Sequence, residues 1–282
     1  YGPASHALSM TVPRDPDALR ADAPHDPGLR LRLVPVEDWK PVADLYDAVT
    51  RTRPGMIARN DGWHLRAARD EPSLREGRSA LRCVVAEDDK GVRGYARYAT
   101  KPDWAPTGPH GKVHVREVIA GDAAARAALY RYLFDLDLMG TTELENVPVD
   151  DPLLHWLTNI RTASPTLGDA LYVRLVDLPA ALAQRTYSTT VDVVLDVTDD
   201  LCPWNAGRWR LRGNADGAQC SRTDDDPDVA VPVTVLGAAY LGGTSLAGLA
   251  AAGQVQVRRD GALEPVSAAF SGSPAPWCPF VF

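Results

Sequence analysis

Cysteine is scarce in this chain of 282 residues, and basic residues are too few to balance the acidic ones. The cysteines are too far apart for a CxxC redox pair or a zinc site, and too few for a disulfide framework: Cys83, Cys202, Cys220 and Cys278. We therefore expect reduced thiols, as in a cytoplasmic protein. Lys and Arg number 30 against 37 Asp and Glu, which gives a formal net charge of −7. Such a chain is a poor general binder of nucleic acid and is not attracted to an anionic membrane.

Uncharged runs long enough to span a bilayer are also rare. One occupies residues 229–257, where several glycines and Pro232 interrupt it. Residues 229–236 are β-branched and predict a strand, whereas residues 246–252 are rich in Ala and Leu and predict a helix. We therefore predict a buried strand–turn–helix and no membrane span. The chain starts at Tyr1 rather than Met and opens without a signal segment, so we expect a fragment or a processed product.

The first half of the chain predicts an arm, two helices and then a layered α/β region. Residues 1–30 are rich in Pro, Asp and Arg, which is typical of an extended arm or linker. Glu37 or Asp38 is expected to cap a helix that ends near Thr50, with one apolar stripe of Trp39, Val42, Leu45, Tyr46 and Val49. A second helix is predicted from Asp61 to about Asp70, with Trp63 and Leu65 facing inward.

Two strands joined by the turn signal at residues 88–91 follow, and then a third strand over residues 112–120. The alternation of the third strand predicts that Val113, Val115 and Glu117 lie on one face and that His114, Arg116 and Val118 lie on the other. Asp122 is expected to cap a strong helix. A strand near residues 141–147, a short helix and a strand over residues 170–178 complete the order of an α/β layer fold.

The pattern changes near residue 178, where we place a domain boundary. A short helix is expected first, followed by strands over residues 190–199, 207–213, 219–223 and 229–236 and a helix over residues 245–253. The chain ends in an apolar, Pro-rich tail. Periodicity alone thus predicts an α/β domain followed by an α+β domain.

General site motifs are weak. His110 and His114 have helical ligand spacing, but Pro109 and Gly111 prevent a helix there, so we predict no metal site. Asp224, Asp225, Asp226 and Asp228 lack the glycine and the distal Glu of an EF-hand, and we expect a solvated acidic turn. The chain has no GxGxxG, P-loop or GxSxG motif.

Several stretches, in order, resemble the enhanced intracellular survival (Eis) family of GNAT-type N-acetyltransferases. They cover nearly the whole chain: "YGPAS" at the start, "RTRPGMIARNDGW" at 51–63, "YRYLFDLDLM" at 130–139, "DALYVRLVDLPAALAQRTYS" at 169–188, "VTDDLCPWNAGRWRL" at 197–211, "LGAAYLGGTSLAGLAAAGQV" at 236–255 and the aromatic C-terminus.

The resemblance implies a GNAT-like mixed-sheet domain followed by a sterol-carrier-protein-like domain. Residues 1–30 would be the end of an N-terminal GNAT domain and a linker, residues 31–178 a second GNAT-like domain, and residues 179–282 the sterol-carrier-like domain. The GNAT cofactor loop, Q/R-x-x-G-x-G/A, would follow the strand at 111–120. This sequence has "GDAAARAA" there, and Asp122 would put a negative charge at the phosphate position. We therefore expect that acetyl-CoA is bound by the missing N-terminal domain and that this chain alone is inactive.

By the same resemblance, the parent protein transfers acetyl from acetyl-CoA to amines of the aminoglycoside or polyamine type. Family members assemble as hexamers, so a homo-oligomer is expected, with no metal. Two alternatives stay open. One is a lipid- or sterol-carrying module with a tunnel lined by Leu236, Leu241, Leu246, Leu249 and Val255, side chains that could equally fill an ordinary core. The other is an oligomerisation scaffold.

The resemblance also assigns the two catalytic residues, which lie at the two ends of the chain. The Tyr before Gly-Pro-Ala is the family's general acid, which protonates the departing CoA thiolate, and it matches Tyr1. The family's general base is the C-terminal carboxylate, which belongs here to Phe282. Burial among aromatic side chains would raise the pKa of that carboxylate toward working pH. The prolines and aromatic residues of the tail favour its anchoring.

Overall fold

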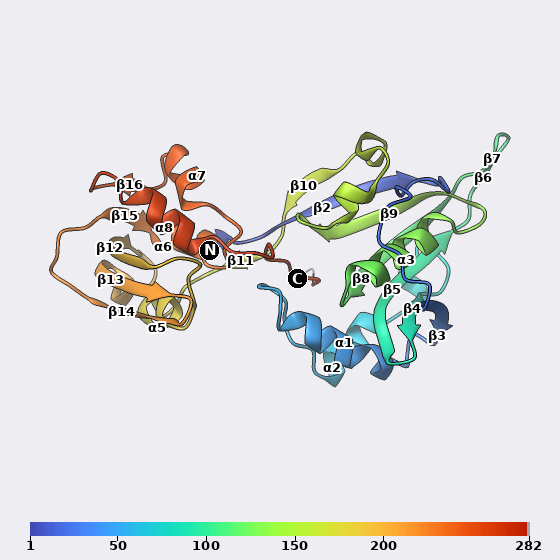
Figure 1. The fold of residues 1–282 in the computed structure, drawn as a ribbon, viewed down its shortest axis with the longest axis horizontal. Helices are drawn as coiled ribbons and strands as arrows, with labels where there is room; N and C mark the ends of the chain where they lie inside the picture. The colour runs from blue at the N-terminus through green and yellow to red at the C-terminus, as the bar shows by residue number, and fades with distance from the viewer. Residues whose placement is uncertain (281–282) are drawn as a thin grey trace. The chain divides into compact units, whose positions relative to one another are not determined.

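The computed structural model describes residues 1–280, and they form two compact units (Figure 1). One unit is Ala7–Gly168, and the other combines Tyr1–His6 with the chain from Asp169 onward. The chain passes from one unit to the other between Gly168 and Asp169. The sequence pattern predicts a domain boundary near residue 178. Each unit has its own sheet and its own hydrophobic core.

The Ala7–Gly168 unit is built on a seven-stranded mixed sheet of order β10-β2-β9-β8-β5-β4-β3. Strands β8 and β9 run parallel to each other, whereas the pairs β2–β9, β5–β8, β4–β5 and β3–β4 are antiparallel. The strands are β2 (His6–Pro13), β3 (Arg30–Val34), β4 (Arg82–Asp88), β5 (Gly91–Lys101), β8 (Gly111–Ala120), β9 (Met139–Pro148) and β10 (Thr166–Asp169). A small separate hairpin is formed by β6 (Trp104–Ala105) and β7 (Gly108–Pro109).

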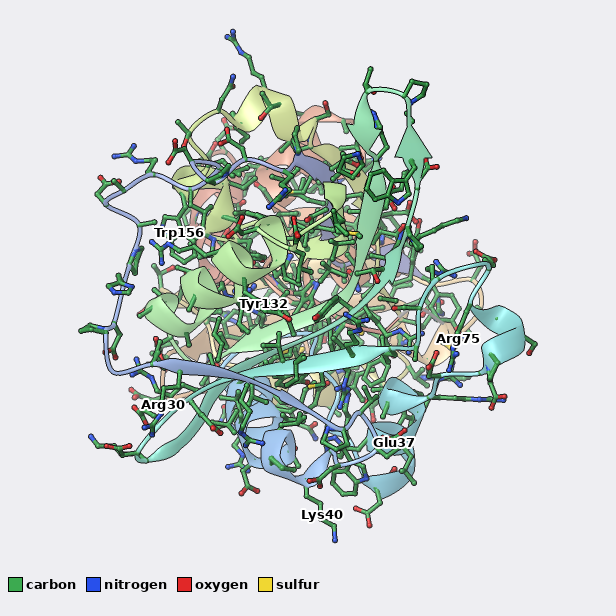
Figure 2. All side chains as sticks on the ribbon, turned by 90° about the vertical axis from the view of Figure 1, so that its right-hand side faces the viewer. Arg30, Glu37, Lys40, Arg75, Tyr132 and Trp156 are labelled. Carbon is green, nitrogen blue, oxygen red and sulfur yellow. The ribbon has the colours of Figure 1, made fainter. Side chains whose placement is uncertain are left out.

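Helices cover both faces of this sheet, with α3 on one side and α1 on the other (Figure 2). Side chains alternate along β5: Ala96 and Tyr98 join the core with Leu129 and Leu133 of α3, whereas Tyr95 and Arg97 point to the opposite face. The helices are α1 (Lys40–Thr50), α2 (Asp61–Ala68), α3 (Ala123–Phe134), α4 (Leu153–Trp156) and the 3₁₀ turns η1 (Pro72–Leu74) and η2 (Ile160–Ala163).

Three sequence expectations for this unit need correction. Residues 6–13, assigned to an arm or linker, form strand β2, and its apolar side chains Met10 and Val12 are buried because β2 pairs with β9. Helix α1 begins one residue after Trp39, with proline in its first turn and no side-chain cap from Glu37 or Asp38. In α2 the inward residues are His64 and Ala68, while Leu65 is exposed.

The second unit has a five-stranded sheet of order β14-β13-β12-β15-β16. Strands β12 and β15 are parallel, and the other neighbours are antiparallel. A two-stranded ladder of β1 and β11 belongs to the same unit. The strands are β1 (Gly2–Pro3), β11 (Tyr172–Val173), β12 (Val191–Thr198), β13 (Gly207–Asn214), β14 (Gly217–Arg222), β15 (Val229–Pro232) and β16 (Gln256–Val257). The helices are α5 (Leu178–Ala183), the 3₁₀ turn η3 (Pro203–Asn205), α6 (Val233–Ala239), α7 (Leu246–Ala251) and α8 (Leu263–Phe270).

The apolar run at 229–257 contains strand β15, helices α6 and α7 and the two residues of β16, so the strand predicted over 229–236 ends at Pro232. Helix α8 was not predicted, and the strand expected over 170–178 is reduced to Tyr172–Val173. Within residues 1–280, no helix combines the length and the apolarity needed to cross a membrane.

Four of the five side chains considered for a tunnel contribute to the core of this unit, while Leu241 is partly exposed. Leu236, Leu246 and Val255 are buried members of its hydrophobic cluster, and Leu249 packs against them. The tunnel reading therefore gains no support from these positions.

Candidate functional site

Tyr1, the predicted general acid, lies next to the ladder that starts the chain. Gly2 pairs with Val173, and a Cβ on Gly2 would come within 2.0 Å of the Thr234 carbonyl oxygen on α6. Only glycine fits this close backbone approach. The Tyr1 side chain is 74% exposed. The backbone beside Tyr1 is therefore fixed by packing, while its phenol stays accessible.

Phe282, the predicted base, lies outside the described residues, as does Val281. The tail that leads to it is held in place: Trp277 is 4% exposed and Cys278 is 2% exposed. Pro276 packs closely on Gly243: a Cβ atom added to Gly243 would lie 2.5 Å from the ring of Pro276. A general-base role for the terminal carboxylate stays a prediction.

The turn between β8 and α3 is the position at which the family resemblance places a GNAT cofactor loop. Asp122 caps α3, and its carboxylate accepts a hydrogen bond from the Ala125 amide at 3.0 Å. The same carboxylate pairs with Arg93 at 2.9 Å. Partial burial opposes ionisation, but these hydrogen bonds outweigh it and hold the pKa of Asp122 below its usual value. The first turn of α3 thus already holds an anion of the protein itself.

Neighbouring groups close this turn further. The Arg93 guanidinium also pairs with Asp26 at 2.6 Å and with Asp88 at 3.2 Å, so the loop is surrounded by carboxylates. A Cβ on Gly121, the only glycine of the turn, would come within 3.2 Å of Leu45 Cδ1. A pyrophosphate would have to displace this network and would meet several negative charges.

One turn further along α3, a buried ion pair follows the cap. Arg126 donates to Asp151 at 2.7 Å, and the Tyr130 hydroxyl donates to the same carboxylate at 3.1 Å. The Asp151 and Tyr130 side chains are buried, and burial raises the pKa of Tyr130. The other Asp151 oxygen accepts from the Leu153 amide at the start of α4, so this carboxylate fastens α3 to the segment after β9.

The opposite face of the sheet holds a buried charge cluster, which we define as Arg59, Tyr95, Arg97 and Glu117. Glu117 accepts from Arg97 at 2.6 Å, from Arg59 at 2.8 Å and from the Tyr95 hydroxyl at 3.1 Å. Burial alone would raise the pKa of Glu117, but the two guanidiniums outweigh it and hold this pKa below its usual value. An ionised carboxylate with these partners is unsuited to act as a general base, so the cluster is structural.

Aromatic rings and a histidine pack around this charge cluster. The Arg59 guanidinium lies 3.9 Å from the centre of the Tyr46 ring. His64 stacks on Trp39 at 4.6 Å between ring centres, and burial lowers its pKa. The sequence pattern misplaces Glu117, because the alternation of the third strand predicts it on the face of Val113 and Val115. In the structure the register of β5 and β8 shifts between the Arg97–Glu117 and Tyr98–Val115 pairs, so Glu117 lies on the face opposite to these two valines. Its partners come from distant segments and carried no local signal.

The weaker motifs have separate local partners. His114 Nδ1 lies 2.7 Å from a Glu143 carboxylate oxygen, and His110 Nε2 lies 2.8 Å from the Thr107 hydroxyl. No three His, Cys, Asp or Glu side chains come together as metal ligands anywhere in residues 1–280. Asp228 corrects the expectation of a solvated acidic turn: it is 8% exposed, and it accepts a hydrogen bond from the Val194 amide at 2.8 Å. None of the four cysteines, all of which lie within residues 1–280, forms a disulfide bond.

Two domain families match the chain, one in each half. Residues 55–175 match the acetyltransferase (GNAT) domain, and residues 178–279 match the sterol carrier protein domain. The predicted succession of a GNAT-like mixed-sheet domain and a sterol-carrier-protein-like domain is therefore confirmed.

Known proteins align with the whole length of the chain. An uncharacterized N-acetyltransferase of Streptomyces avermitilis is 46% identical over 100% of this chain and 69% of its own length. N-acetyltransferase Eis of Mycobacterium tuberculosis is 30% identical over 96% of this chain and 65% of its own length. The crystal structure of Eis1 from Mycobacterium abscessus superposes with a TM-score of 0.79 and 30% identity, covering 100% of this chain and 69% of that protein.

Proposed function

Since the chain belongs to the Eis-like family of GNAT-type N-acetyltransferases, we propose that it acts in an enzyme that transfers an acetyl group from acetyl-CoA to an amine. The observation that carries this proposal is the alignment of the whole chain, through both domains, with N-acetyltransferases. We propose amines of the aminoglycoside or polyamine type as acceptors. The net charge of −7 agrees with a cationic acceptor.

We also propose that acetyl-CoA is bound by a different GNAT domain of the enzyme and not at the β8–α3 turn. The support is electrostatic: the Asp122 carboxylate occupies the amides of the first turn of α3, and Asp26 and Asp88 lie around Arg93. A helix N-terminus attracts phosphate only when its amides are free to donate. In this proposal the chain alone neither binds acetyl-CoA nor catalyses transfer.

The proposed chemistry assigns one proton transfer to each end of the chain. The Phe282 carboxylate takes a proton from the substrate ammonium, and the amine lone pair then attacks the thioester carbonyl. The carbon–sulfur bond breaks, Tyr1 gives its phenolic proton to the CoA thiolate, and the second proton that leaves the nitrogen restores the Tyr1 phenol through solvent. The roles rest on the family resemblance, with support from the buried Trp277 and Cys278 of the tail. A cytoplasmic homohexamer completes the proposal.

The test has two parts. The enzyme that contains this chain is assayed for CoA thiol release with acetyl-CoA and a panel of aminoglycosides and spermidine, and we expect amine-dependent release. No release above background hydrolysis with any of these amines would refute the proposed acceptors. The 282-residue chain is then titrated calorimetrically with acetyl-CoA, and we expect no measurable heat of binding. Micromolar binding would refute the placement of the cofactor elsewhere.

A further inference from the structure

The loop at residues 242–244 lies between α6 and α7, in the unit that combines Tyr1–His6 with the chain from Asp169 onward (Figure 1). Its sequence is Gly-Gly-Thr. This loop contacts both the strand that follows Tyr1 and the tail that leads to Phe282. The two predicted catalytic groups therefore extend from backbone segments that share one short loop as a neighbour.

Toward the first strand, the loop holds the backbone just after Tyr1. The Thr244 hydroxyl donates to the Pro3 carbonyl oxygen at 3.2 Å. A Cβ added to Gly243 would lie 3.3 Å from the Ala4 carbonyl oxygen, which is a tight approach. Pro3 is also a residue of the β1–β11 ladder. The loop thus adds a further contact to the strand from which Tyr1 extends.

Toward the tail, the same loop is in closer contact. The Cβ added to Gly243 would lie 2.5 Å from Cγ and 2.7 Å from Cδ of Pro276. The Gly272 amide, at the start of the tail, donates to the Gly242 carbonyl oxygen at 3.2 Å. Cys278, which follows Pro276 by two positions, is 2% exposed. The tail is therefore packed on the loop shortly before the chain ends.

The loop is itself held by a buried contact between two helices. Arg185 donates to the Tyr240 carbonyl oxygen at 2.7 Å and to the Phe270 carbonyl oxygen at 3.1 Å. Tyr240 is the C-cap of α6, which precedes the loop, and Phe270 ends α8, which precedes the tail. Because closely packed segments transmit a displacement rather than absorb it, added volume in the loop should move the strand or the tail.

We propose that Gly243 and Thr244 are positioning residues, which set the Tyr1 phenol and the C-terminal tail relative to each other. Gly243 does so by lacking a side chain, because the Pro276 ring and the Ala4 carbonyl both approach its Cβ position. Thr244 does so through its hydrogen bond to the strand. An acid and a base that serve one acetyl transfer must be correctly spaced, so a displacement of either lowers the rate. This inference rests on the proposed function of the two chain ends.

Cysteine labelling tests the contact between the loop and the tail without any enzymatic activity. Cys278 and Cys83 are both 2% exposed, and they lie in different units. In the 282-residue chain, Gly243→Ala should raise the rate of Cys278 modification by N-ethylmaleimide at least about tenfold, because the added methyl group displaces Pro276. Peptide mass spectrometry identifies the modified thiol, and the rate at Cys83 should not change.

Gly248→Ala is the matched control. Gly248 lies in the neighbouring helix α7, and the nearest contact of an added Cβ would be with Ser245 at an ordinary 3.7 Å. Its Cys278 modification rate should equal that of the wild type, and circular dichroism checks that both variants fold. An unchanged Cys278 rate in Gly243→Ala, or an equal rise in Gly248→Ala, would overturn the proposal.

Thr244 variants, which add no bulk to the loop, test the catalytic consequence in the enzyme that contains this chain. Thr244→Val keeps the shape of the side chain but removes the hydrogen bond to Pro3, whereas Thr244→Ser keeps the hydroxyl. We expect kcat for amine acetylation to fall at least about threefold in Thr244→Val and to stay near the parental value in Thr244→Ser, with the KM for acetyl-CoA unchanged in both. In a Tyr1→Phe background, Thr244→Val should lower kcat no further, because it acts through Tyr1.

The kinetic outcomes separate this role from the proposed function. If the wild-type enzyme acetylates amines, three results each refute the positioning role: an unchanged kcat in Thr244→Val, an equal fractional loss in both backgrounds, or an equal loss in Thr244→Ser. A wild-type enzyme that acetylates no amine would instead refute the proposed function itself and, with it, the role of the loop in catalysis.

Discussion

Replacing Glu117 with glutamine should destabilise the Ala7–Gly168 unit strongly, although the side chain keeps its size. The carboxylate neutralises Arg59 and Arg97, whose side chains are 2% and 1% exposed, and is itself 4% exposed. Glutamine removes the negative charge that these two buried guanidiniums share. Removing one partner from a buried ion pair typically costs about 3–5 kcal/mol of unfolding free energy. For a unit of this size, that corresponds to a fall in Tm of about 6–20 °C.

The matched control is Glu87→Gln on β4. Glu87 pairs with Arg32 at 2.9 Å, but these side chains are 24% and 56% exposed, so solvent screens the pair. Its loss should cost no more than about 1 kcal/mol. Calorimetric or urea unfolding of the wild type and both variants measures the difference. If Glu117→Gln loses less than about 1 kcal/mol, the cluster does not stabilise the unit in the way argued here.

The pH dependence gives the same prediction an independent readout. The pKa of Glu117 is lowered from the ordinary 4.5 in the folded state, because the attraction of Arg59 and Arg97 exceeds the effect of burial. The stabilisation is therefore complete above the pKa of the unfolded chain and is lost as pH falls through the lower folded-state value. The stability difference between wild type and Glu117→Gln should stay constant from neutral pH to about pH 5 and shrink under more acidic conditions. A difference that grows on acidification would refute this sign.

The remaining predictions concern the two chain ends. In the enzyme that contains this chain, Tyr1→Phe should lower kcat by about 10²–10⁴, the usual contribution of a general acid, and a change smaller than threefold would speak against that role. One to three extra residues after Phe282 should abolish amine acetylation while acetyl-CoA still binds; turnover at the parental rate would exclude the terminal carboxylate as base. Gly2→Ala should destabilise its unit by about 1–3 kcal/mol, since its Cβ would collide with the Thr234 carbonyl. Gly168→Ala, with open space around the added Cβ, is the control for unfolding measurements.

Local signals explain which elements could be predicted from the sequence. The hairpin of β4 and β5 turns at Asp88–Gly91, where Gly91 has φ of +130°, a conformation that glycine adopts readily. The cap of α3 is equally local, since Asp122 lies three residues from the amide it binds. Strand β2 was difficult to predict, because its short alternating pattern lies next to a stretch rich in Pro and Asp. Its pairing partner β9 is more than a hundred residues away in the sequence.

Proline explains two of the errors in the second unit. Pro232 lies within a β-branched stretch that predicts a continuous strand, yet it is the N-cap of α6. The amides at the start of a helix have no acceptor within the helix, so the missing amide of proline is tolerated there. Pro265 interrupts a sequence that otherwise has a helical composition, but it lies in the first turn of α8, where a missing amide costs little. In both places the sequence pattern alone could not show which side of the proline becomes helical, because packing against the core decides it.

The same division between local and distant signals applies to the sites. A helix cap can be read from a few consecutive residues, so the occupied first turn of α3 was already evident in "GDAAARAA". The charge cluster depends on Arg59, Arg97 and Glu117, which lie on three segments that only the fold brings together. The GNAT-like sheet therefore carries buried charge on one face while a carboxylate closes the phosphate position of its principal helix. In our proposal, such a domain holds its own charges at this turn, and a different GNAT domain binds the nucleotide cofactor.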